Sequence, residues 1–216
     1  MSFINSNTGI MKDLTGFLTR KQMERLLKYC ENDNQRVLLW VLMRTGRRIT
    51  EIIGRKPYVH RNKNEGISKV YPGIVGIRPC DILWDSSQIS FAIVKKRKPV
   101  RKLKYVDEMT LKILKQYIEV NEIQKKEQLF NWTRGGVYKM LRRIGDKAGI
   151  RSVGSKRLHP HHFRHSYAVL RVKMDKSAES LRKLQQHLEH HSLDMTAHYL
   201  QFNPEDEKEV AEKMWK

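Results

Sequence analysis

Pro160-His161-His162-Phe163-Arg164-His165-Ser166-Tyr167-Ala168 is the stretch that decides the fold and the chemistry of this chain. It lies in a helix predicted over about 160–174, where His161 and Arg164 are three residues apart and share a face. An arginine guanidinium is a planar fork that suits two phosphate oxygens. A histidine can donate a hydrogen bond to a third oxygen or accept a proton. The stretch therefore predicts a phosphate-binding face on this helix.

Two other interpretations of the same histidine-rich stretch stay open at the level of sequence. One is a surface turn without a ligand, because short motifs of this kind often arise by chance. The other is a metal site, for which the chain offers four histidines close together: His159, His161, His162 and His165.

A histidine and a tyrosine follow after one further helix length. His190 precedes Tyr199 by nine residues. A tyrosine hydroxyl has an ordinary pKa of about 10 and is a weak nucleophile unless neighbouring groups activate it. Tyr199 is predicted to attack a phosphate held by the arginine and histidine side chains. A plain core aromatic is the alternative, because Leu200 and Phe202 flank it.

A second arginine motif, Thr45-Gly46-Arg47-Arg48-Ile49-Thr50-Glu51, stands at a predicted helix start. Glu51 follows Arg48 by about one turn, so its carboxylate can orient the guanidinium. The structural alternative is an arginine that only caps this helix or pairs with Glu51. The motif gains weight from the histidines, arginine and tyrosine farther along the chain.

Taken together, these motifs resemble the blocks of the tyrosine recombinases, the family of phage integrases and Xer-type recombinases. Residues 44–52 resemble the first block, Ala-Thr-Gly-x-Arg-x-x-Glu-Leu, and residues 160–168 resemble the second, Pro-His-x-Leu-Arg-His-Ser-Phe-Ala. Residues 188–193 and Tyr199 resemble the third, Leu-Gly-His-Ser-Ser-Ile with a later tyrosine, although Glu189 stands where the family has glycine. The likeness runs over about residues 17–202 in consistent order.

The resemblance implies a catalytic set and a chemistry that needs neither metal nor other cofactor. In this family the arginines and one histidine stabilise charge on the phosphate, another histidine takes the tyrosine proton, and a hairpin lysine protonates the leaving 5′ oxygen. Gapless placement puts that lysine on Lys98, and Lys96 on the same strand face is the alternative. The implied catalytic residues are Arg48, Lys98, His161, Arg164, His190 and Tyr199, with Glu51 and His165 in support.

The hydrophobic pattern predicts a mainly helical chain with a small antiparallel β-sheet, the α+β class of the family that it resembles. Residues 1–16 are expected to be a flexible lead-in, 17–202 the catalytic domain and 203–216 a tail helix. A strand is expected over 88–95, a turn over 98–101 and a return strand through Val106. Helices are expected from Thr19 and over about 34–43, 47–53, 107–126, 134–149, 160–174, 177–190, 193–200 and 204–215.

The composition points to a polyanionic partner. The formal charge of +20 makes nucleic acid the default partner, since each neutralised phosphate releases a counterion, and a generically basic surface or a ribosomal-type protein is the alternative. The resemblance implies that the nucleic acid is double-stranded DNA. The longest apolar run, Val37–Met43, is far shorter than the roughly 20 residues that cross a bilayer, and no signal segment opens the chain. A cytoplasmic protein without membrane contact is expected. Cys30 and Cys80 are expected to be reduced, without a zinc site.

Residues 55–80 form a segment rich in basic residues, prolines and glycines, longer than the matching family segment. It is predicted to be an inserted basic loop that touches the DNA backbone, and a solvated loop without a ligand is the alternative. The predicted DNA contacts are Arg47, Lys56, Arg61 and Lys63.

The two ends of the chain raise further expectations through the resemblance. Relatives carry a helical domain that closes around DNA before the catalytic domain, so this chain is either a fragment or a minimal enzyme. The acidic tail resembles helices that dock on a neighbouring subunit in a tetramer on DNA, with Val210 and Met214 as anchors. Docking back onto its own domain is the alternative.

The expected function is that of a site-specific DNA recombinase or integrase. A type IB topoisomerase shares the chemistry, but its second block usually has lysine where His161 stands. A DNA-binding protein that keeps the fold without cutting is the other alternative. The full set of catalytic residue types argues against it.

Overall fold

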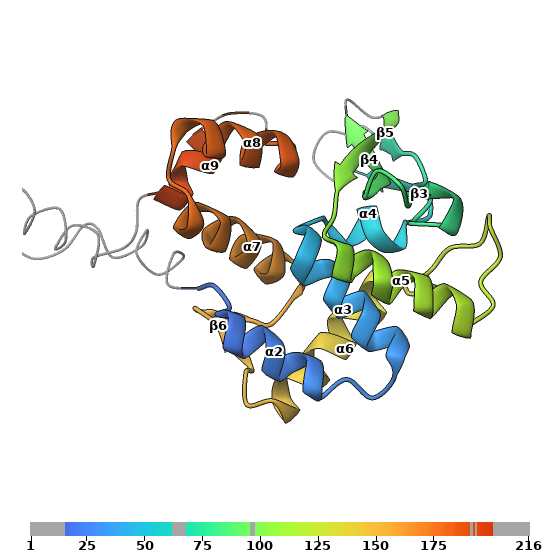
Figure 1. Ribbon diagram of the computed structural model, residues 1–216, viewed down its shortest axis with the longest axis horizontal. Helices are drawn as coiled ribbons and strands as arrows, with labels where there is room; N and C mark the ends of the chain where they lie inside the picture. The colour runs from blue at the N-terminus through green and yellow to red at the C-terminus, as the bar shows by residue number, and fades with distance from the viewer. Residues whose placement is uncertain (1–15, 62–67, 96–97, 191, 193, 201–216) are drawn as a thin grey trace, which may run out of the picture.

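The computed structural model describes residues 16–61, 68–95, 98–190, 192 and 194–200, and Figure 1 shows their arrangement. The helices are α2 (Arg20–Lys28), α3 (Asp33–Thr45), α4 (Ile49–Ile53), α5 (Glu108–Val120), α6 (Arg134–Lys147), α7 (Pro160–Met174), α8 (Ala178–Leu188) and α9 (Asp194–Ala197), with 3₁₀ turns η1 (Pro79–Asp81) and η2 (His198–Leu200). The strands are β1 (Tyr58–Arg61), β2 (Ser68–Tyr71), β3 (Ile82–Leu83), β4 (Gln88–Lys95), β5 (Lys98–Tyr105), β6 (Ser152–Val153) and β7 (Lys156–Arg157). This mainly helical chain with small antiparallel sheets confirms the predicted fold class.

Polar side chains at the helix starts set several helix boundaries. The side chain of Asn32 accepts the N–H of Gln35 at 3.0 Å where α3 begins, and Asp107 accepts the N–H of Thr110 at 3.1 Å where α5 begins. Such caps satisfy donors that a helix start leaves unpaired, and each contributes about 1 kcal/mol. Gly46 ends α3 in the left-handed region, at a φ of 60°, and turns the chain toward α4.

The main sheet has the strand order β3-β4-β5 and is antiparallel. Ile89, Phe91 and Ile93 alternate along β4 and are buried on one face, which confirms the predicted strand over 88–95. The pairing of β4 with β5 extends to Lys95 opposite Lys98. Residues 98–101 are therefore strand and not the predicted turn, and Pro99 is tolerated because β5 is an edge strand.

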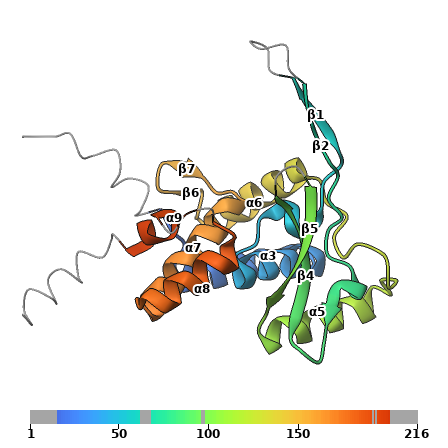
Figure 2. The ribbon, with the colours of Figure 1, turned by 90° about the horizontal axis from the view of Figure 1, so that it is seen from above.

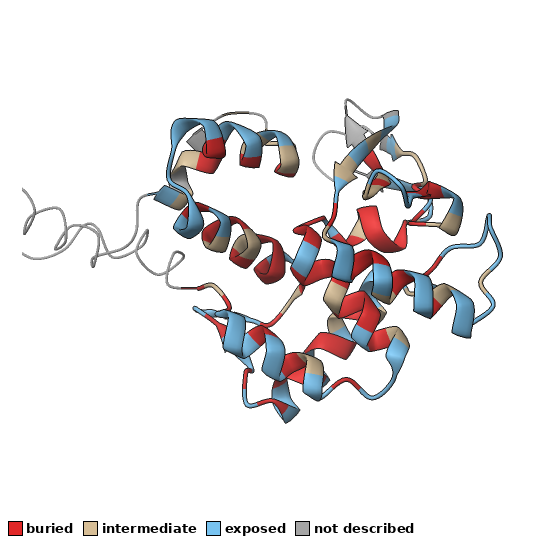
Figure 3. Cartoon of the chain, in the orientation of Figure 1, coloured by how far each residue is buried: buried red, intermediate tan, exposed pale blue. Residues whose placement is uncertain are grey.

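Two groups of buried apolar side chains support the fold. The larger group is made of side chains from the helices α2 through α6, from the main sheet and from Phe163 near the start of α7. Figure 3 shows its buried residues gathered around α3 and α4. The smaller one lies between the later turns of α7 and α8, and Tyr167 and Tyr199 pack against it. Its buried members are Ala168, Val172, Leu181, Leu184 and Leu188.

The segment predicted as a basic loop over 55–80 contains a two-stranded hairpin. β1 and β2 pair from Tyr58 opposite Tyr71 to Arg61 opposite Ser68, and Figure 2 shows them extending away from the body. The rings of Tyr58 and Tyr71 stack with centroids 4.7 Å apart, and the Arg55 guanidinium lies 5.0 Å from the Tyr58 ring centroid. This cross-strand pair fixes the strands in a segment that its prolines and glycines had marked as loop.

Some sequence-based expectations fall where the structure gives no description. Residues 1–15 and the predicted tail helix with its anchors Val210 and Met214 lie outside the described residues. Within the described part, no helix has both the length and the apolar character needed to cross a membrane. Cys30 is buried, Cys80 is exposed, and both thiols are free.

Candidate active site

Arg48 stands at the start of α4, two residues after the turn at Gly46. A Cβ atom on Gly46 would lie 2.6 Å from the Tyr167 ring, so only glycine allows α3 and α7 to approach this closely. Arg48 donates from Nη1 to Glu51 Oε1 at 3.0 Å and from its backbone N–H to Glu51 Oε2 at 3.2 Å. Its side chain stays 44% exposed. The predicted Arg48–Glu51 pair is thus confirmed, and it orients the guanidinium while leaving it open to a ligand.

Arg47 points into the protein. Its side chain is fully buried, with the guanidinium 5.7 Å from the Phe91 ring centroid and 3.7 Å from Glu51 Oε2. Within the described part, its three guanidinium nitrogens make no hydrogen bond. Burial lowers the pKa of Arg47, against the charges of Glu51 and Glu189, which raise it. The prediction that Arg47 contacts DNA is wrong, because the side chain does not reach the surface.

The side chains of His159 and His162 cap the N-terminus of α7. His159 Nδ1 accepts the backbone N–H of His161 at 3.2 Å, and His162 Nδ1 accepts that of His159 at 3.2 Å. The rings of His159 and His162 stack with centroids 3.9 Å apart. Their Nδ1 atoms are therefore occupied by the helix cap. Among the described residues, no group of three or more His, Cys, Asp or Glu side chains is placed to hold a metal ion.

Arg164 lies one turn after His161 and is only 2% exposed. Its Nη1 donates to the Gly46 carbonyl at 3.1 Å, and its Nη2 donates to the Leu188 carbonyl at the end of α8. Burial, together with repulsion from Arg48, lowers the pKa of Arg164 to about 10, so the side chain remains charged at neutral pH. Arg164 thereby fixes a positive charge between the α3–α4 turn and the end of α8.

His161 is the surface-facing member of the α7 motif. Partial burial of its ring, followed by the charge of Arg164, lowers the pKa of His161 to about 4, although the residue as a whole is exposed. A neutral imidazole at pH 7 has a nitrogen free of its proton and can act as a base. The predicted proton acceptor is therefore in the protonation state that its role requires.

His190 and Tyr199 lie beside each other after α8, with ring centroids 6.2 Å apart. His190 Nδ1 is 2.9 Å from the Oγ1 of Thr196, a fully buried residue. Burial and then the charges of Arg164 and Arg48 lower the pKa of His190 to about 4. If Thr196 donates to Nδ1, the neutral ring carries its proton on Nε2 and can donate it to a ligand.

Tyr199 is partly buried between the small core and the histidines of the site. Its ring packs against the small core, and it also lies 5.3 Å, centroid to centroid, from the ring of His165. Burial raises the pKa of the Tyr199 hydroxyl, whereas the charge of Arg164 lowers it. A hydroxyl of this kind keeps its proton at neutral pH, so nucleophilic attack requires a nearby base.

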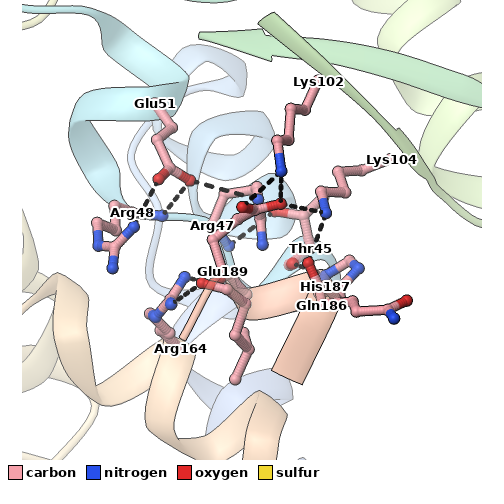
Figure 4. A network of polar contacts seen from close by, with 12 residues as sticks. Thr45, Arg47, Arg48, Glu51, Lys102, Lys104, Arg164, Gln186, His187 and Glu189 are labelled. Carbon is pink, nitrogen blue, oxygen red and sulfur yellow. Dashed lines mark hydrogen bonds and ion pairs between the residues drawn. The ribbon is translucent and has the colours of Figure 1, made fainter. Parts of the chain in front are cut away.

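The electrostatics tie the separate motifs into one site. The charges of Arg48 and Arg164 act on the pKa of both His161 and His190, and that of Arg164 also acts on Tyr199. Figure 4 shows Arg48 and Arg164 with the polar groups around them. The hydrogen bonds of Arg164 to Gly46 and Leu188 and the contact of His190 with Tyr199 place five of the six predicted catalytic residues in one region. They come from the N-terminus of α4, α7, the turn after α8 and η2.

The sixth residue, the hairpin lysine, is only partly described. Lys98 begins β5 opposite Lys95, while its side chain and the alternative, Lys96, lie outside the described part. Among the predicted DNA contacts, Lys56 is exposed just before β1, whereas Lys63 and the side chain of Arg61 are also outside the described part. These assignments stay predictions.

Sequence analysis missed a group of charged residues next to this site. Lys102 and Lys104 on β5 both bind the carboxylate of Glu189, at 2.8 Å each (Figure 4). It also missed His187, whose Nε2 lies 2.7 Å from the Thr45 carbonyl. The available signal was a glutamate in place of the family glycine and two lysines two residues apart on one strand face.

The fold and the site define a mainly helical catalytic domain with two arginines, two histidines and a tyrosine at one place. The chain belongs to the phage integrase family, whose model matches residues 72–206. That match includes the motifs of α7 and of the segment after α8, and Arg48 lies before it.

Solved structures of site-specific recombinases share this fold. XerA recombinase is 21% identical with a TM-score of 0.65, over 92% of this chain and 64% of that one. XerH recombinase, bound to its difH substrate before cleavage, is 21% identical with a TM-score of 0.61, over 100% of this chain and 58% of that one. The catalytic domain of bacteriophage HP1 integrase is 18% identical with a TM-score of 0.58, over 91% and 94%.

The chain spans less than two thirds of the XerA and XerH chains. Comparison with curated protein sequences finds no match.

Proposed function

We propose that this chain acts as a site-specific DNA recombinase or integrase that cuts and rejoins double-stranded DNA through a 3′-phosphotyrosyl intermediate. The observation that carries the proposal is the position of Arg164. It bonds to the turn beside Arg48 and to the end of α8 beside His190, whose ring lies next to Tyr199, and it is one helical turn from His161. Membership of the phage integrase family and the net charge of +20 support DNA as the substrate. The similar XerH and Tn1549 integrase structures contain DNA.

The cleavage step balances with the residues at hand. The Tyr199 hydroxyl oxygen forms a bond to phosphorus and its proton passes to the neutral His161. The bond between phosphorus and the 5′ oxygen breaks, and this oxygen leaves as a hydroxyl after receiving a proton from the general acid. Attack by a 5′ hydroxyl of a partner duplex reverses these transfers and frees Tyr199, so that no ATP is consumed.

Charge on the phosphate grows in the transition state and needs fixed donors. Arg48 is open to the surface, Arg164 is locked between two carbonyls, and His190 is oriented by Thr196. Removing one such preorganised donor typically slows a reaction by about 10²–10³-fold. We assign the general acid to Lys98, with Lys96 as the alternative, since β5 begins there.

The proposal extends to DNA binding and assembly. Lys56, Arg61 and Lys63 on and beside the β1–β2 hairpin would contact phosphates, and removal of one contact should reduce the slope of log affinity against log salt by about 0.9. Self-association on DNA, as a tetramer, would use residues 203–216. The protein would act in the cytoplasm, with the DNA on which it works.

Covalent capture tests the proposal. Wild-type protein and Tyr199→Phe are incubated with fragmented genomic DNA of the source organism and denatured in detergent, and the DNA attached to protein is sequenced. Adducts at one recurrent sequence with the wild type, and none with Tyr199→Phe, are expected because only the hydroxyl can form the bond to phosphorus.

Other outcomes separate the alternatives. Adducts at scattered sequences would favour a topoisomerase-like enzyme over a recombinase. Adducts that persist in Tyr199→Phe would contradict the assignment of Tyr199. No adduct from a folded wild-type protein that binds DNA would overturn the proposed chemistry in favour of a DNA-binding protein.

A further inference from the structure

Glu189 occupies a backbone position that favours glycine. It ends α8 with φ 57° and ψ 42°, and its N–H donates to the carbonyl of Gln185. Residues with a Cβ atom adopt this left-handed conformation rarely and at a cost. The side chain of Glu189 is nevertheless only 6% exposed. Contacts of the buried carboxylate therefore have to offset both its desolvation and the backbone conformation.

Those contacts join α8 to the edge of the main sheet. Lys102 donates to the two carboxylate oxygens of Glu189 at 2.8 and 3.0 Å, and Lys104 donates to one of them at 2.8 Å. Lys104 also donates to the carbonyl of Gln186 at 2.6 Å. Residues two apart on a strand point to the same side, so both lysines reach α8 from one face of β5 (Figure 4).

The carboxylate also balances a local excess of positive charge. Arg47 is buried close enough for the charge of Glu189 to act on it, and the charges of Arg47 and Lys102 act on Lys104. Glu51, the other acid near Arg47, is shared with Arg48. Without Glu189, the cations of β5 and Arg47 would repel one another, and β5 would be pushed away from the end of α8.

Glu189 lies where three parts of the site meet. The preceding carbonyl, of Leu188, accepts from Arg164, and the following residue is His190. The lysines that it binds are on the strand that begins at Lys98 and is paired along its whole length with β4. Glu189 thus links the hairpin to the end of α8, next to the residues bound by Arg164 and to His190.

We propose that Glu189 is a positioning residue that, through Lys102 and Lys104, holds the β4–β5 hairpin and its general acid lysine against the phosphate site. This inference rests on the proposed recombinase function. It predicts that loss of Glu189 impairs protonation of the leaving 5′ oxygen more than stabilisation of the phosphate.

A sulfur substrate separates these two effects. In DNA with sulfur in place of the bridging 5′ oxygen, the phosphorus–sulfur bond breaks and the sulfur leaves as a thiolate with the electron pair. Thiols have a pKa of about 8.5, far below that of alcohols, so this leaving group needs no general acid. A misplaced hairpin lysine has little effect on this substrate, whereas a disturbed arginine or histidine still slows its cleavage.

The test measures rates of adduct formation on ordinary and sulfur-containing duplexes that carry the site recovered by covalent capture. Glu189→Gln is expected to slow the reaction on ordinary DNA by about 10–100-fold, as loss of a supporting partner commonly does, and to match the wild type on the sulfur substrate. If Glu189→Gln does not fold, Lys102→Met is the second variant. It removes the more exposed of the two lysines that bind Glu189, and it should show the same pattern. Arg101→Gln is the matched control, because Arg101 pairs with Asp81 within the same sheet region and not with α8.

Equal slowing on both substrates, or no slowing on ordinary DNA, would overturn the inference. Amide hydrogen exchange of the protein without DNA gives a readout that does not depend on activity. Faster exchange in β5 and the last turn of α8 is expected in Glu189→Gln, and unchanged exchange would contradict the tether. A wild type that forms no adduct on either substrate would refute the recombinase function instead, and the exchange data would still decide whether the tether exists.

Discussion

The two apolar cores differ in size and in the chemistry that they support. The large core underlies α4 and the start of α7, and so it fixes Arg48, His161 and Arg164. The small core lies between α7 and α8 and supports the segment with His190 and Tyr199. Since stabilisation by apolar burial grows with the area buried, the arginines rest on the firmer part of the molecule. The proposed nucleophile, Tyr199, packs against the smaller core.

Polar contacts join the small unit to the large one. Arg164 donates to the Leu188 carbonyl, Lys104 to that of Gln186, and His187 approaches the Thr45 carbonyl at 2.7 Å. A hydrogen bond of this kind contributes about 0.5–1.5 kcal/mol, and bonds from charged groups contribute more. Such contacts orient the two units relative to each other. They can nevertheless open at a free energy below that of global unfolding. The comparison indicates that the proposed phosphate site is fixed by the large core. The placement of the proposed nucleophile, Tyr199, depends on these polar contacts between the two units, the polar seam.

Replacing Arg164 is expected to have the largest effect, because this side chain serves both the phosphate site and the seam. Lysine keeps the charge but has one terminal nitrogen in place of the two guanidinium nitrogens that donate separately to Gly46 and Leu188. Arg164→Lys should slow adduct formation by about 10²–10³-fold and lower the melting temperature. Arg171→Lys, on an exposed face of the same helix, is the control. Near-wild-type rates with Arg164→Lys would show that the forked donor is not required.

Replacing one leucine by alanine in each core tests directly whether the two cores are stabilised differently. Leu42 and Leu184 are both buried, in the large and the small core respectively. Leu42→Ala should lower the free energy of unfolding by about 2–5 kcal/mol. Leu184→Ala should lower it less, but should raise amide exchange locally in α8 and slow adduct formation. Equal loss of global stability, without local exchange, would mean that the two cores unfold as one cooperative unit.

The elements that sequence analysis located well are those with local signals. The helix over 160–174 and the strand over 88–95 match α7 and β4, because periodicity and turn residues are properties of neighbouring positions. The strands β1 and β2 were missed, since the Tyr58–Tyr71 stack that holds them joins residues thirteen positions apart. Gly66 between the strands, and Pro57, Pro72 and Gly73 beside them, marked the segment as loop.

The site residues show the same limit. Arg47 and Arg48 are adjacent and of the same residue type. The Arg47 side chain is nevertheless buried against Phe91, whereas the Arg48 side chain is exposed. The direction of each side chain follows from how α4 packs on β4, which no local pattern records. The contact between Lys102 and Glu189 joins positions 87 residues apart, and so it required the tertiary structure.

Removing the hydroxyl that orients His190 should have a moderate effect. Thr196→Val is similar in volume but cannot hydrogen-bond to His190 Nδ1. The imidazole then loses its fixed tautomer and orientation, and adduct formation should slow by about tenfold, the lower end for loss of a supporting partner. Thr110→Val, at a fully buried threonine of α5 whose hydroxyl bonds to Asp107 and Trp40, should lower stability without changing the rate. Rates that change equally in both variants would refute a specific role for Thr196.

Mild acid should weaken the seam and has the smallest expected effect. Burial and then the charge of Arg47 lower the pKa of His187 to about 3, from about 6.5 in an unfolded chain. Because the unfolded chain binds the proton first, stability is full above pH 6.5 and is lost as the pH falls from 6.5 toward 3, by at most about 1.4 kcal/mol per pH unit for this group. His187→Gln cannot take up that proton. Its unfolding free energy, measured with urea between pH 7 and pH 5, should therefore fall less steeply than that of the wild type, and parallel curves would show that His187 does not sense pH at the seam.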